Sequence, residues 1–377
     1  MENFRSASVR IAGLCFELHG SVPILDEFVC HSKEKSDGQI CCIQKPLYDG
    51  SERLVSDNNG ITVFERNDGS WLYRLSDMPD EFQVALSADY KTVSLYVKNF
   101  ENKELEYAQR TLLRMALESI MVNTSRISLH SACVETNGEA VAFTGASGMG
   151  KSTRAAAWVN AAKAQLISGD RAVIRISSDG VSACGVPWDG KEQIFRNVEK
   201  PLKAILEVRR SDSDYLRRLT PEQAQKVIMK QVFIPMWDTN AAFGAIMNIR
   251  KLAKSVPVYR VFCGPDEKNA ENIRRILFEN PDEILEESVE MKIREGFVLR
   301  NIADEYIVMP TGGKIAKFDG AVALNEVSAF IFEKLANPMS KEDLVEALVN
   351  EYEVDSETAA KDIDSLISKF EEWEIIE

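Results

Sequence analysis

The alternation of apolar and polar residues predicts a strand-rich stretch over residues 1–100. Apolar side chains alternate or cluster in short runs at residues 9–16, 72–75, 82–86 and 92–97, as half-buried strands require. Clusters of Asn, Asp, Gly and Ser separate several of these runs and are typical of turns. The stretch contains no catalytic motif, so the sequence does not define its role.

A helix and a hairpin are predicted next. Residues 101–121 repeat apolar side chains at helical spacing. Residues 127–135 and 139–144 are strand-like and are joined by Asn137-Gly138, a dipeptide typical of two-residue hairpin turns. The second strand leads directly into a glycine-rich segment, so the hairpin is expected to position that segment.

The middle of the chain continues with alternating strand and helix patterns. Residues 164–167, 202–209 and 256–262 are predicted strands, and residues 269–278 are a predicted helix. Residues 220–228 begin with Thr-Pro-Glu-Gln, in which Thr and Gln form a capping box and Pro suits the first helical position. Strands alternating with helices favour an α/β domain.

The last part of the chain has a pattern of its own. The acidic segment 280–290 follows a helix, contains a proline and is predicted to be a domain boundary. Residues 296–302, 306–309 and 314–317 are predicted strands, and three amphipathic helices follow them. Residues 291–377 therefore predict a small winged-helix-like α+β module, whose sheet edge suits an extended peptide.

Composition and charge narrow the classes of function. A chain of 377 residues is too long for one ordinary core. The net charge of -14 argues against binding nucleic acid or anionic membranes through overall charge, and the acidic helices of the last module disfavour DNA recognition. The N-terminus lacks an apolar signal core and no apolar run is long enough to span a bilayer. Together with seven cysteines without CxxC spacing, this predicts a cytoplasmic protein.

The glycine-rich segment matches the G-x-x-x-x-G-K-[ST] pattern of phosphate-binding loops, between a predicted strand and a predicted helix. Its glycines permit positive φ and let backbone N–H groups approach an oxyanion, and the helix N-terminus adds positive potential. The candidate nucleotide-binding residues are Gly145, Ala146, Ser147, Gly148, Met149, Gly150, Lys151, Ser152 and Thr153. The motif predicts a nucleoside triphosphate but does not define the fate of its γ-phosphate.

Polar residues on neighbouring elements are candidates for the chemistry around this loop. His130 lies on the strand before the loop, and Asp170 follows an apolar strand at the end where open α/β sheets bind ligands. A carboxylate there, with the Ser152 hydroxyl, suits Mg²⁺. Two alternatives stay open: His130 as a core histidine, and Asp170 as part of a turn with Gly169 and Arg171.

Two further segments supply charged candidates. Residues 185–192 are rich in turn formers and hold Lys191 and Glu192; they form either a loop that closes over phosphates or a solvated connection. The next strand carries Glu207, a further candidate metal ligand, and Arg209. Lys191 or Arg209 is a candidate to neutralise charge during phosphoryl transfer, in the manner of an arginine finger.

The middle of the chain resembles the HPr kinase/phosphorylase family, including its relatives that phosphorylate a serine of lasso-type peptides. Residues 129–130, 145–153, 166–171 and 206–209 stand, in this order, where that family has a histidine, its phosphate loop, an acidic segment and a Glu-Ile-Arg signature. The resemblance implies a P-loop kinase domain of this type with ATP and Mg²⁺ as cofactors. Its expected extent is residues 101–282, preceded by a β-rich N-terminal part.

One departure from the family concerns its acidic segment. The family usually has two adjacent aspartates there, of which the first is the expected general base for the acceptor serine. In this chain the pair is Gly169-Asp170. The role of general base therefore falls to Asp170, His130 or Glu192, or is absent, and the choice stays open. The phosphorylase reaction and HPr itself as substrate are not supported.

A second resemblance covers residues 296–377. Leu324-Asn-Glu-Val after a strand, Tyr352 and the last amphipathic helix are similar to the PqqD family, whose domains recognise leader peptides of ribosomally made, modified peptides. This resemblance implies a precursor peptide as partner. A generic winged-helix domain is the alternative.

The sequence thus predicts an ATP-dependent kinase that phosphorylates a Ser or Thr of a ribosomally synthesised precursor peptide, with the leader bound by the C-terminal module. Two alternatives stay open, a small-molecule kinase and a non-catalytic nucleotide-binding scaffold or chaperone for peptide maturation. The peptide, its acceptor residue and the oligomeric state, with a homo-oligomer among the options, are not defined by the sequence.

Overall fold

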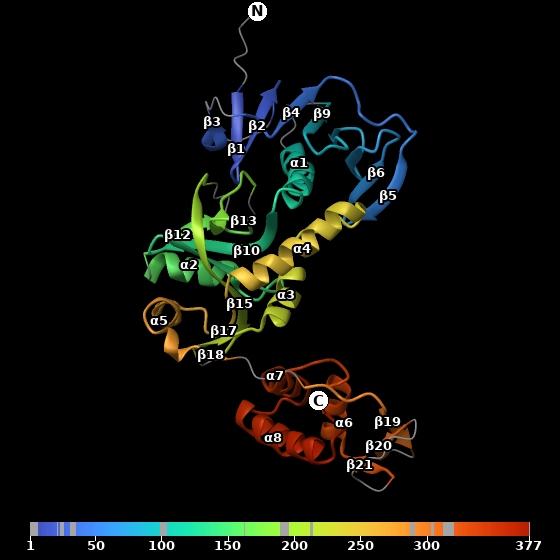
Figure 1. The fold of residues 1–377 in the computed structure, drawn as a ribbon, viewed down its shortest axis with the longest axis vertical. Helices are drawn as coiled ribbons and strands as arrows, with labels where there is room; N and C mark the ends of the chain where they lie inside the picture. The colour runs from blue at the N-terminus through green and yellow to red at the C-terminus, as the bar shows by residue number, and fades with distance from the viewer. Residues whose placement is uncertain are drawn as a thin grey trace, which may run out of the picture. The chain divides into compact units, whose positions relative to one another are not determined.

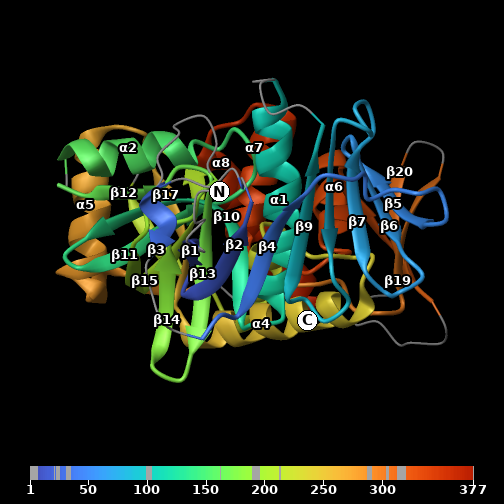
Figure 2. The same ribbon diagram turned by 90° about the horizontal axis from the view of Figure 1, so that it is seen from above.

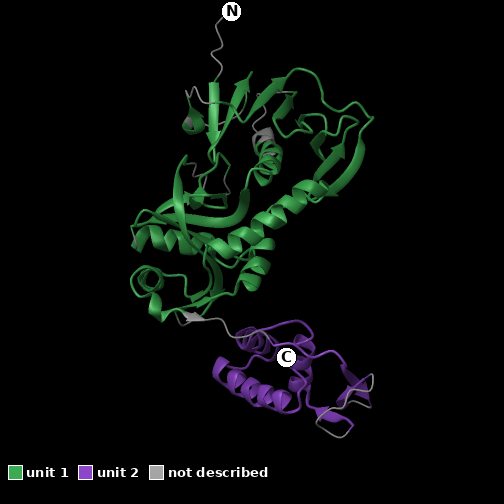
Figure 3. Cartoon of the chain, viewed as in Figure 1, with its two compact units in different colours: residues 1–285 green, residues 286–377 purple. Residues whose placement is uncertain are grey.

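The protein divides into two compact units, residues 1–285 and residues 286–377 (Figure 3). The division falls inside the acidic segment 280–290. The computed structural model describes residues 7–20, 22, 26–30, 35–98, 104–161, 163–188, 196–211, 214–286, 291–302, 305–311 and 320–376.

The first unit opens with a nine-stranded sheet of order β3-β1-β2-β4-β9-β8-β7-β6-β5 (Figure 1). Its strands are β1 Ala7–Ile11, β2 Leu14–His19, β3 Val29–Cys30, β4 Gly38–Ile43, β5 Arg53–Asn58, β6 Ile61–Glu65, β7 Trp71–Leu75, β8 Phe82–Leu86 and β9 Thr92–Val97. The single strand predicted over residues 9–16 is wrong. Ala12 and Gly13 have φ of 49° and 77°, which breaks the run into the hairpin β1–β2.

A long helix, α1 (Glu104–Val122), packs on β7, β8 and β9 of this sheet (Figure 2). Its buried side chains include Leu112, Ala116 and Leu117, which join Val84 and Leu95 of the strands in one core. The helical spacing of the apolar residues predicted this helix, because a helix on a sheet buries one stripe of its surface. The strand-rich N-terminal stretch therefore forms a sheet that shares one hydrophobic core with α1.

The second sheet has the order β11-β10-β13-β14-β15-β17-β16-β18, with β12 also paired to β10 and β11 also paired to β15. Its strands are β10 Arg126–Thr136, β11 Glu139–Thr144, β12 Gln165–Ser168, β13 Arg171–Ser177, β14 Gly180–Cys184, β15 Glu199–Arg210, β16 Tyr215–Arg218, β17 Val258–Cys263 and β18 Leu285–Glu286. The predicted hairpin is confirmed, with Asn137 and Gly138 at φ of 52° and 81°. Because β11, β15 and β17 are parallel, their carboxyl ends meet at one edge.

Helices cover both faces of this second sheet. The helices are α2 Lys151–Ala161, α3 Pro221–Met229, α4 Thr239–Ser255 and α5 Glu267–Phe278. Along β11, Ala140 and Ala142 join the core of α3 and α4, whereas Val141 and Phe143 join the core of α2 and α5, as alternation across a strand requires. The capping box that opens α3 is confirmed in both of its halves.

Helix α4 was not predicted from the sequence. It begins after Asp238, whose carboxylate accepts from the backbone N–H groups of Asn240 and Ala241. The helix buries one face, but Phe243 remains 65% exposed and Met247 36% exposed on the other. Apolar residues on both faces obscure the helical period, which is the pattern that sequence analysis relies on.

Replacing Trp158 by alanine is expected to lower the free energy of unfolding by about 3–5 kcal/mol. Trp158 on α2 is 1% exposed, and its ring meets that of Phe143 edge to face at a centroid distance of 5.3 Å. Urea denaturation measures the change. Val159→Ala is the control, because Val159 is 37% exposed and should shift the value by under about 1 kcal/mol. A loss for Trp158→Ala no larger than the control's would contradict the prediction.

The second unit is a three-stranded sheet followed by three helices. Its elements are β19 Phe297–Ile302, β20 Glu305–Pro310, β21 Val322–Leu324, α6 Glu326–Lys334, α7 Lys341–Tyr352 and α8 Ser356–Glu372. Strand β20 lies between the other two, and a separate core that includes Ile331, Leu344 and Phe370 holds the unit together. The strand predicted over residues 314–317 lies outside the described residues, and β21 is the third strand of this sheet.

Capping and charge characterise this unit. The sequence also predicts helix starts at Asn325 and at Ser340. Their side chains accept from the backbone N–H groups of Ser328 and Asp343, at 2.8 Å and 3.1 Å, so both helices begin with a side-chain cap. The unit holds 22 acidic and 9 basic residues. It therefore carries nearly all of the net charge of -14, which opposes contact with nucleic-acid phosphates.

Candidate functional site

The glycine-rich segment connects the end of β11 to the start of α2. Gly145, Gly148 and Gly150 have φ of 134°, 80° and 90°, a backbone region that other residues rarely adopt. A Cβ on Gly148 would meet no atom within 4 Å, so its conformation rather than crowding requires glycine there, whereas a Cβ on Gly150 would lie 2.6 Å from the Arg154 guanidinium. The loop thus wraps the N-terminus of α2, where backbone N–H groups attract anions.

Lys151 folds back over its own loop. Its Nζ donates to the carbonyl oxygens of Gly145 and Ala146, at 3.0 Å and 3.1 Å, and the residue is only 8% exposed. Burial lowers the pKa of the Lys151 ammonium, and the nearby Asp170 carboxylate partly offsets this, because burial penalises a charge that an opposite charge favours. The lysine is therefore held at the loop before any ligand arrives.

The pKa of Lys151 is expected to lie below the ordinary lysine value of about 10.4, and Asp170→Asn should lower it further. Between the lowered pKa of folded Lys151 and about 10.4, the unfolded chain binds more protons at this lysine than the folded protein does. The contribution of Lys151 to the free energy of unfolding therefore rises with pH across this range. NMR of ¹³C-labelled lysine, assigned with Lys151→Arg, measures the titration. A pKa at or above the ordinary value would refute the expectation.

Asp170 and His130 face each other beside the loop. Nε2 of His130 lies 3.3 Å from Oδ1 of Asp170, and Nε of Arg171 lies 3.7 Å from Oδ2. The hydrogen bond with His130 lowers the pKa of the Asp170 carboxyl against the opposing effect of burial, so the carboxyl is ionised at neutral pH. Both side chains keep solvent access, at 29% for His130 and 41% for Asp170, so a substrate can reach the pair.

The Ser152 hydroxyl ties the helix to this acidic turn. It donates to the Gly169 carbonyl at 3.4 Å, and the Ser131 N–H donates to the Asp170 carbonyl at 2.9 Å. Within the described part of the chain, no three His, Cys, Asp or Glu side chains are grouped to hold a metal ion. A hydroxyl and a single carboxylate still fit Mg²⁺, which takes few protein ligands and completes its shell with phosphate and water oxygens.

Glu207 and Arg209 lie on β15, beside the strand that enters the loop. Register pairs Glu207 with Thr144 of β11 and with Arg260 of β17. Its two carboxylate oxygens accept from Arg209 Nη2 at 3.3 Å and from Arg260 Nε at 3.0 Å. A role for Glu207 as a metal ligand therefore requires that an arginine be displaced. Glu192 and Lys191 lie outside the described residues.

Three arginines at this edge were missed by sequence reasoning. Arg260 partners Glu207, Arg210 donates to the Gly148 carbonyl at 3.0 Å, and Arg154 reaches the loop from α2. Arg154 carried one signal in the sequence. That signal is the position of Arg154 in the first turn of a helix, where the macrodipole is unfavourable for positive charge.

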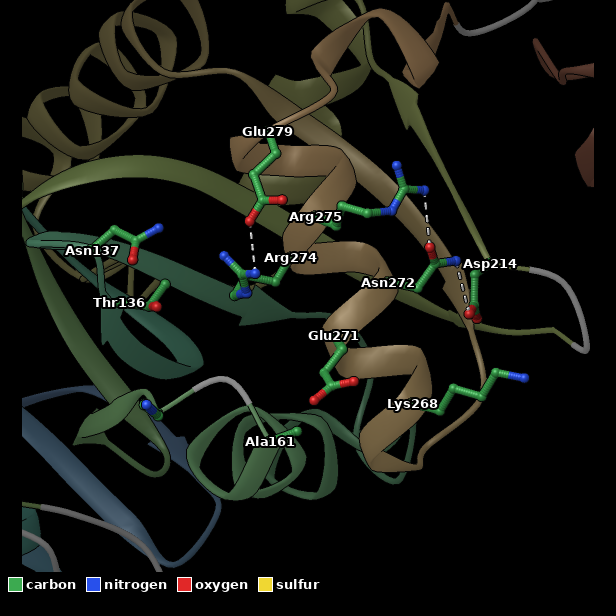
Figure 4. Close-up of a pocket in the computed structure, with 11 residues that line it drawn as sticks. Thr136, Asn137, Ala161, Asp214, Lys268, Glu271, Asn272, Arg274, Arg275 and Glu279 are labelled. Atoms are coloured by element: carbon green, nitrogen blue, oxygen red, sulfur yellow. Dashed lines mark hydrogen bonds and ion pairs between the residues drawn. The ribbon is translucent and has the colours of Figure 1, made fainter.

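A cavity of about 780 Å³ lies at the other end of α2, by Ala161 (Figure 4). The tip of the β10–β11 hairpin and one side of α5 line it, and its polar groups bond one another, as Arg274 does with Glu279 at 2.7 Å. None of the candidate residues lines this cavity. The candidate residues that the structure describes therefore surround the glycine loop and lie outside this cavity.

Comparison with known proteins identifies the second unit. Residues 305–376 match the family model of coenzyme PQQ synthesis protein D (PqqD), so the predicted C-terminal PqqD domain is confirmed. A solved complex of TbiB1 with the TbiA(beta) leader peptide is similar at 24% identity and a TM-score of 0.20, covering 23% of this chain and 94% of that chain. Lasso peptide synthetase B1 complexed with the leader peptide is similar at 23% identity and a TM-score of 0.19, covering 22% and 92%.

A search of the curated proteins found no match. Among the helices of the described residues, none is both long and apolar enough to cross a bilayer.

Proposed function

We propose that the chain is an ATP-dependent kinase that phosphorylates a Ser or Thr of a ribosomally synthesised precursor peptide. The observation that carries the proposal is the convergence of the glycine loop, Lys151 and the Asp170–His130 pair at one edge of the second sheet. Positive φ at three glycines, a lysine over the loop and a carboxylate beside it are the parts that phosphoryl transfer uses.

Each residue has a role in this proposal. The loop N–H groups and Lys151 bind the phosphates, and Ser152 with Asp170 holds Mg²⁺, which neutralises charge on the phosphate oxygens. The acceptor hydroxyl oxygen bonds to the γ-phosphorus while the bond from that phosphorus to the bridging oxygen breaks and ADP leaves. The hydroxyl proton passes to His130 or Asp170, whose contact orients the imidazole as a carboxylate does in other acid–base pairs.

The PqqD domain supplies the second part of the proposal. The leader of the precursor binds this domain, as an added strand on an edge of the sheet β19-β20-β21. Binding there tethers the peptide and raises the effective concentration of its acceptor residue at the loop. The acceptor itself can then bind weakly, which permits one kinase to accept varied residues around it.

A mass-spectrometric assay with Mg-ATP and the precursor peptide tests the proposal. The expected result is a gain of one phosphate that is lost with Asp170→Asn. Gly169 stands where the HPr kinase/phosphorylase family, which this segment resembles, has the first of its two adjacent aspartates. Its absence favours one other candidate, a nucleotide-binding scaffold without turnover. ATP binding without phosphate gain on any Ser or Thr of the peptide would replace the kinase by that scaffold.

A further inference from the structure

We infer that Arg154 is a positioning residue that sets the phosphate-binding conformation of the glycine loop, an inference that rests on the proposed nucleotide binding. Arg154 is 4% exposed and lies in the first turn of α2. Its Nη1 donates to the carbonyl oxygens of Met149 and Gly150, at 3.1 Å and 3.4 Å. The guanidinium therefore contacts the loop from the protein side, and the opposite side is left to a ligand.

The rest of the guanidinium is fixed by the ends of two parallel strands. Nη2 donates to the Cys263 carbonyl at 2.6 Å and to the Arg209 carbonyl at 3.5 Å, and Nε donates to the Cys263 thiol sulfur at 3.1 Å. The planar guanidinium presents its donors in a fixed fork. Through these bonds Arg154 fixes the glycine loop relative to the ends of β15 and β17.

The contacts orient the loop's peptide groups. In each peptide unit the C=O and the N–H of the next residue point in opposite directions. Because Arg154 holds the carbonyls of Met149 and Gly150, the N–H groups of Gly150 and Lys151 point away from it, toward the ligand side. Arg210 holds the Gly148 carbonyl in the same way. Gly150 permits this approach, since a Cβ there would lie 2.6 Å from Arg154 Nη1.

The charge of Arg154 affects the electrostatic potential at the loop. A buried cation at a helix N-terminus opposes the macrodipole and loses hydration. Among the described residues no carboxylate forms an ion pair with Arg154, so carbonyl and thiol acceptors compensate it instead. The charge of the guanidinium adds to the positive potential of the loop. A bound polyphosphate then supplies the countercharge.

The test compares Arg154→Met and Arg154→Lys with the wild-type full chain by calorimetric titration with Mg-ATP and Mg-ADP. Arg154→Met should weaken ATP and ADP binding by about ten- to a hundredfold, as expected for charge-assisted hydrogen bonds. Arg154→Lys should recover part of the loss, because it keeps the charge without the fork. In the kinase assay KM for ATP should rise by a similar factor, and kcat should change by less than about threefold.

Arg250→Met is the matched control, because Arg250 is an exposed arginine on α4, outside the site; it should bind as the wild type does. Partial unfolding of Arg154→Met would lower the number of binding sites per chain, whereas the inference requires a weaker affinity at those sites. Unchanged ATP affinity in a folded Arg154→Met protein overturns the inference. A wild-type protein that binds no nucleotide overturns the proposed function instead, so the two failures are distinct.

Discussion

Replacing Lys151 by methionine is expected to lower the proposed rate of phosphoryl transfer to the precursor peptide by about two to three orders of magnitude. This is the usual cost of removing one preorganised charge from a developing anion. Methionine keeps most of the buried stem, which leaves the packing of α2 in place. It removes the Nζ that bonds the Gly145 and Ala146 carbonyls and that is available to the transferred phosphoryl group. The free protein should not lose stability, since the change also removes a charge whose pKa is lowered by burial.

Initial rates with saturating Mg-ATP and full-length precursor measure the effect. Lys254→Met serves as the control, because Lys254 is exposed on the last turn of α4 and should leave the rate unchanged. A Lys151→Met protein that still transfers phosphate at the wild-type rate would exclude the proposed role of the loop. Loss of nucleotide-dependent peptide binding, with no turnover in either protein, would favour the scaffold instead.

Removing the leader from the precursor is expected to raise KM for the peptide in the proposed reaction by about two to four orders of magnitude and to leave kcat within a few-fold. The tether exchanges a bimolecular encounter for an intramolecular one, and gains of this size arise without any new contact at the acceptor. The PqqD domain over residues 305–376 is the reason to expect leader dependence. Steady-state kinetics with core peptide alone and with full precursor give the two values.

The C-terminal unit offers an independent control. It has its own core around Leu344 and Phe370, so residues 286–377 made alone should fold. Added in excess, this fragment should bind the leader and inhibit phosphorylation of the precursor, while phosphorylation of the core peptide stays unchanged. Equal KM with and without leader would remove the PqqD domain from the reaction and leave a kinase that recognises its acceptor directly.

Local patterns predicted the elements whose signals lie within a few residues of one another. The Asn137-Gly138 turn, the capping box of α3 and the helix starts after Asn325 and Ser340 are all set by neighbouring side chains and backbone, and all are present. The strand, loop and helix around the glycine motif were predicted for the same reason. Local chemistry decides such features, so a single sequence contains the necessary information.

Long-range pairings were not predictable in this way. The two arginines on Glu207 include Arg260, 53 residues away, and Arg154 contacts Cys263, 109 residues away. Whether a carboxylate is open to a metal or held by cations depends on which strands become neighbours. The sequence placed Glu207 near the loop correctly, since it pairs with Thr144, but gave no sign of what its oxygens would bond.

The carbonyl oxygens of Gly145 and Ala146, which accept hydrogen bonds from Lys151, compete with an incoming anion for the lysine ammonium. Two of the three N–H groups of the ammonium are already used in these bonds, each worth about 1 kcal/mol, so an incoming anion bonds the whole ammonium only by displacing them. A monovalent ion such as chloride or acetate recovers little of that cost, whereas a polyphosphate contacts the lysine and several loop N–H groups at once. If the loop binds phosphates as proposed, the resting lysine should therefore favour a polyphosphate over small monovalent anions.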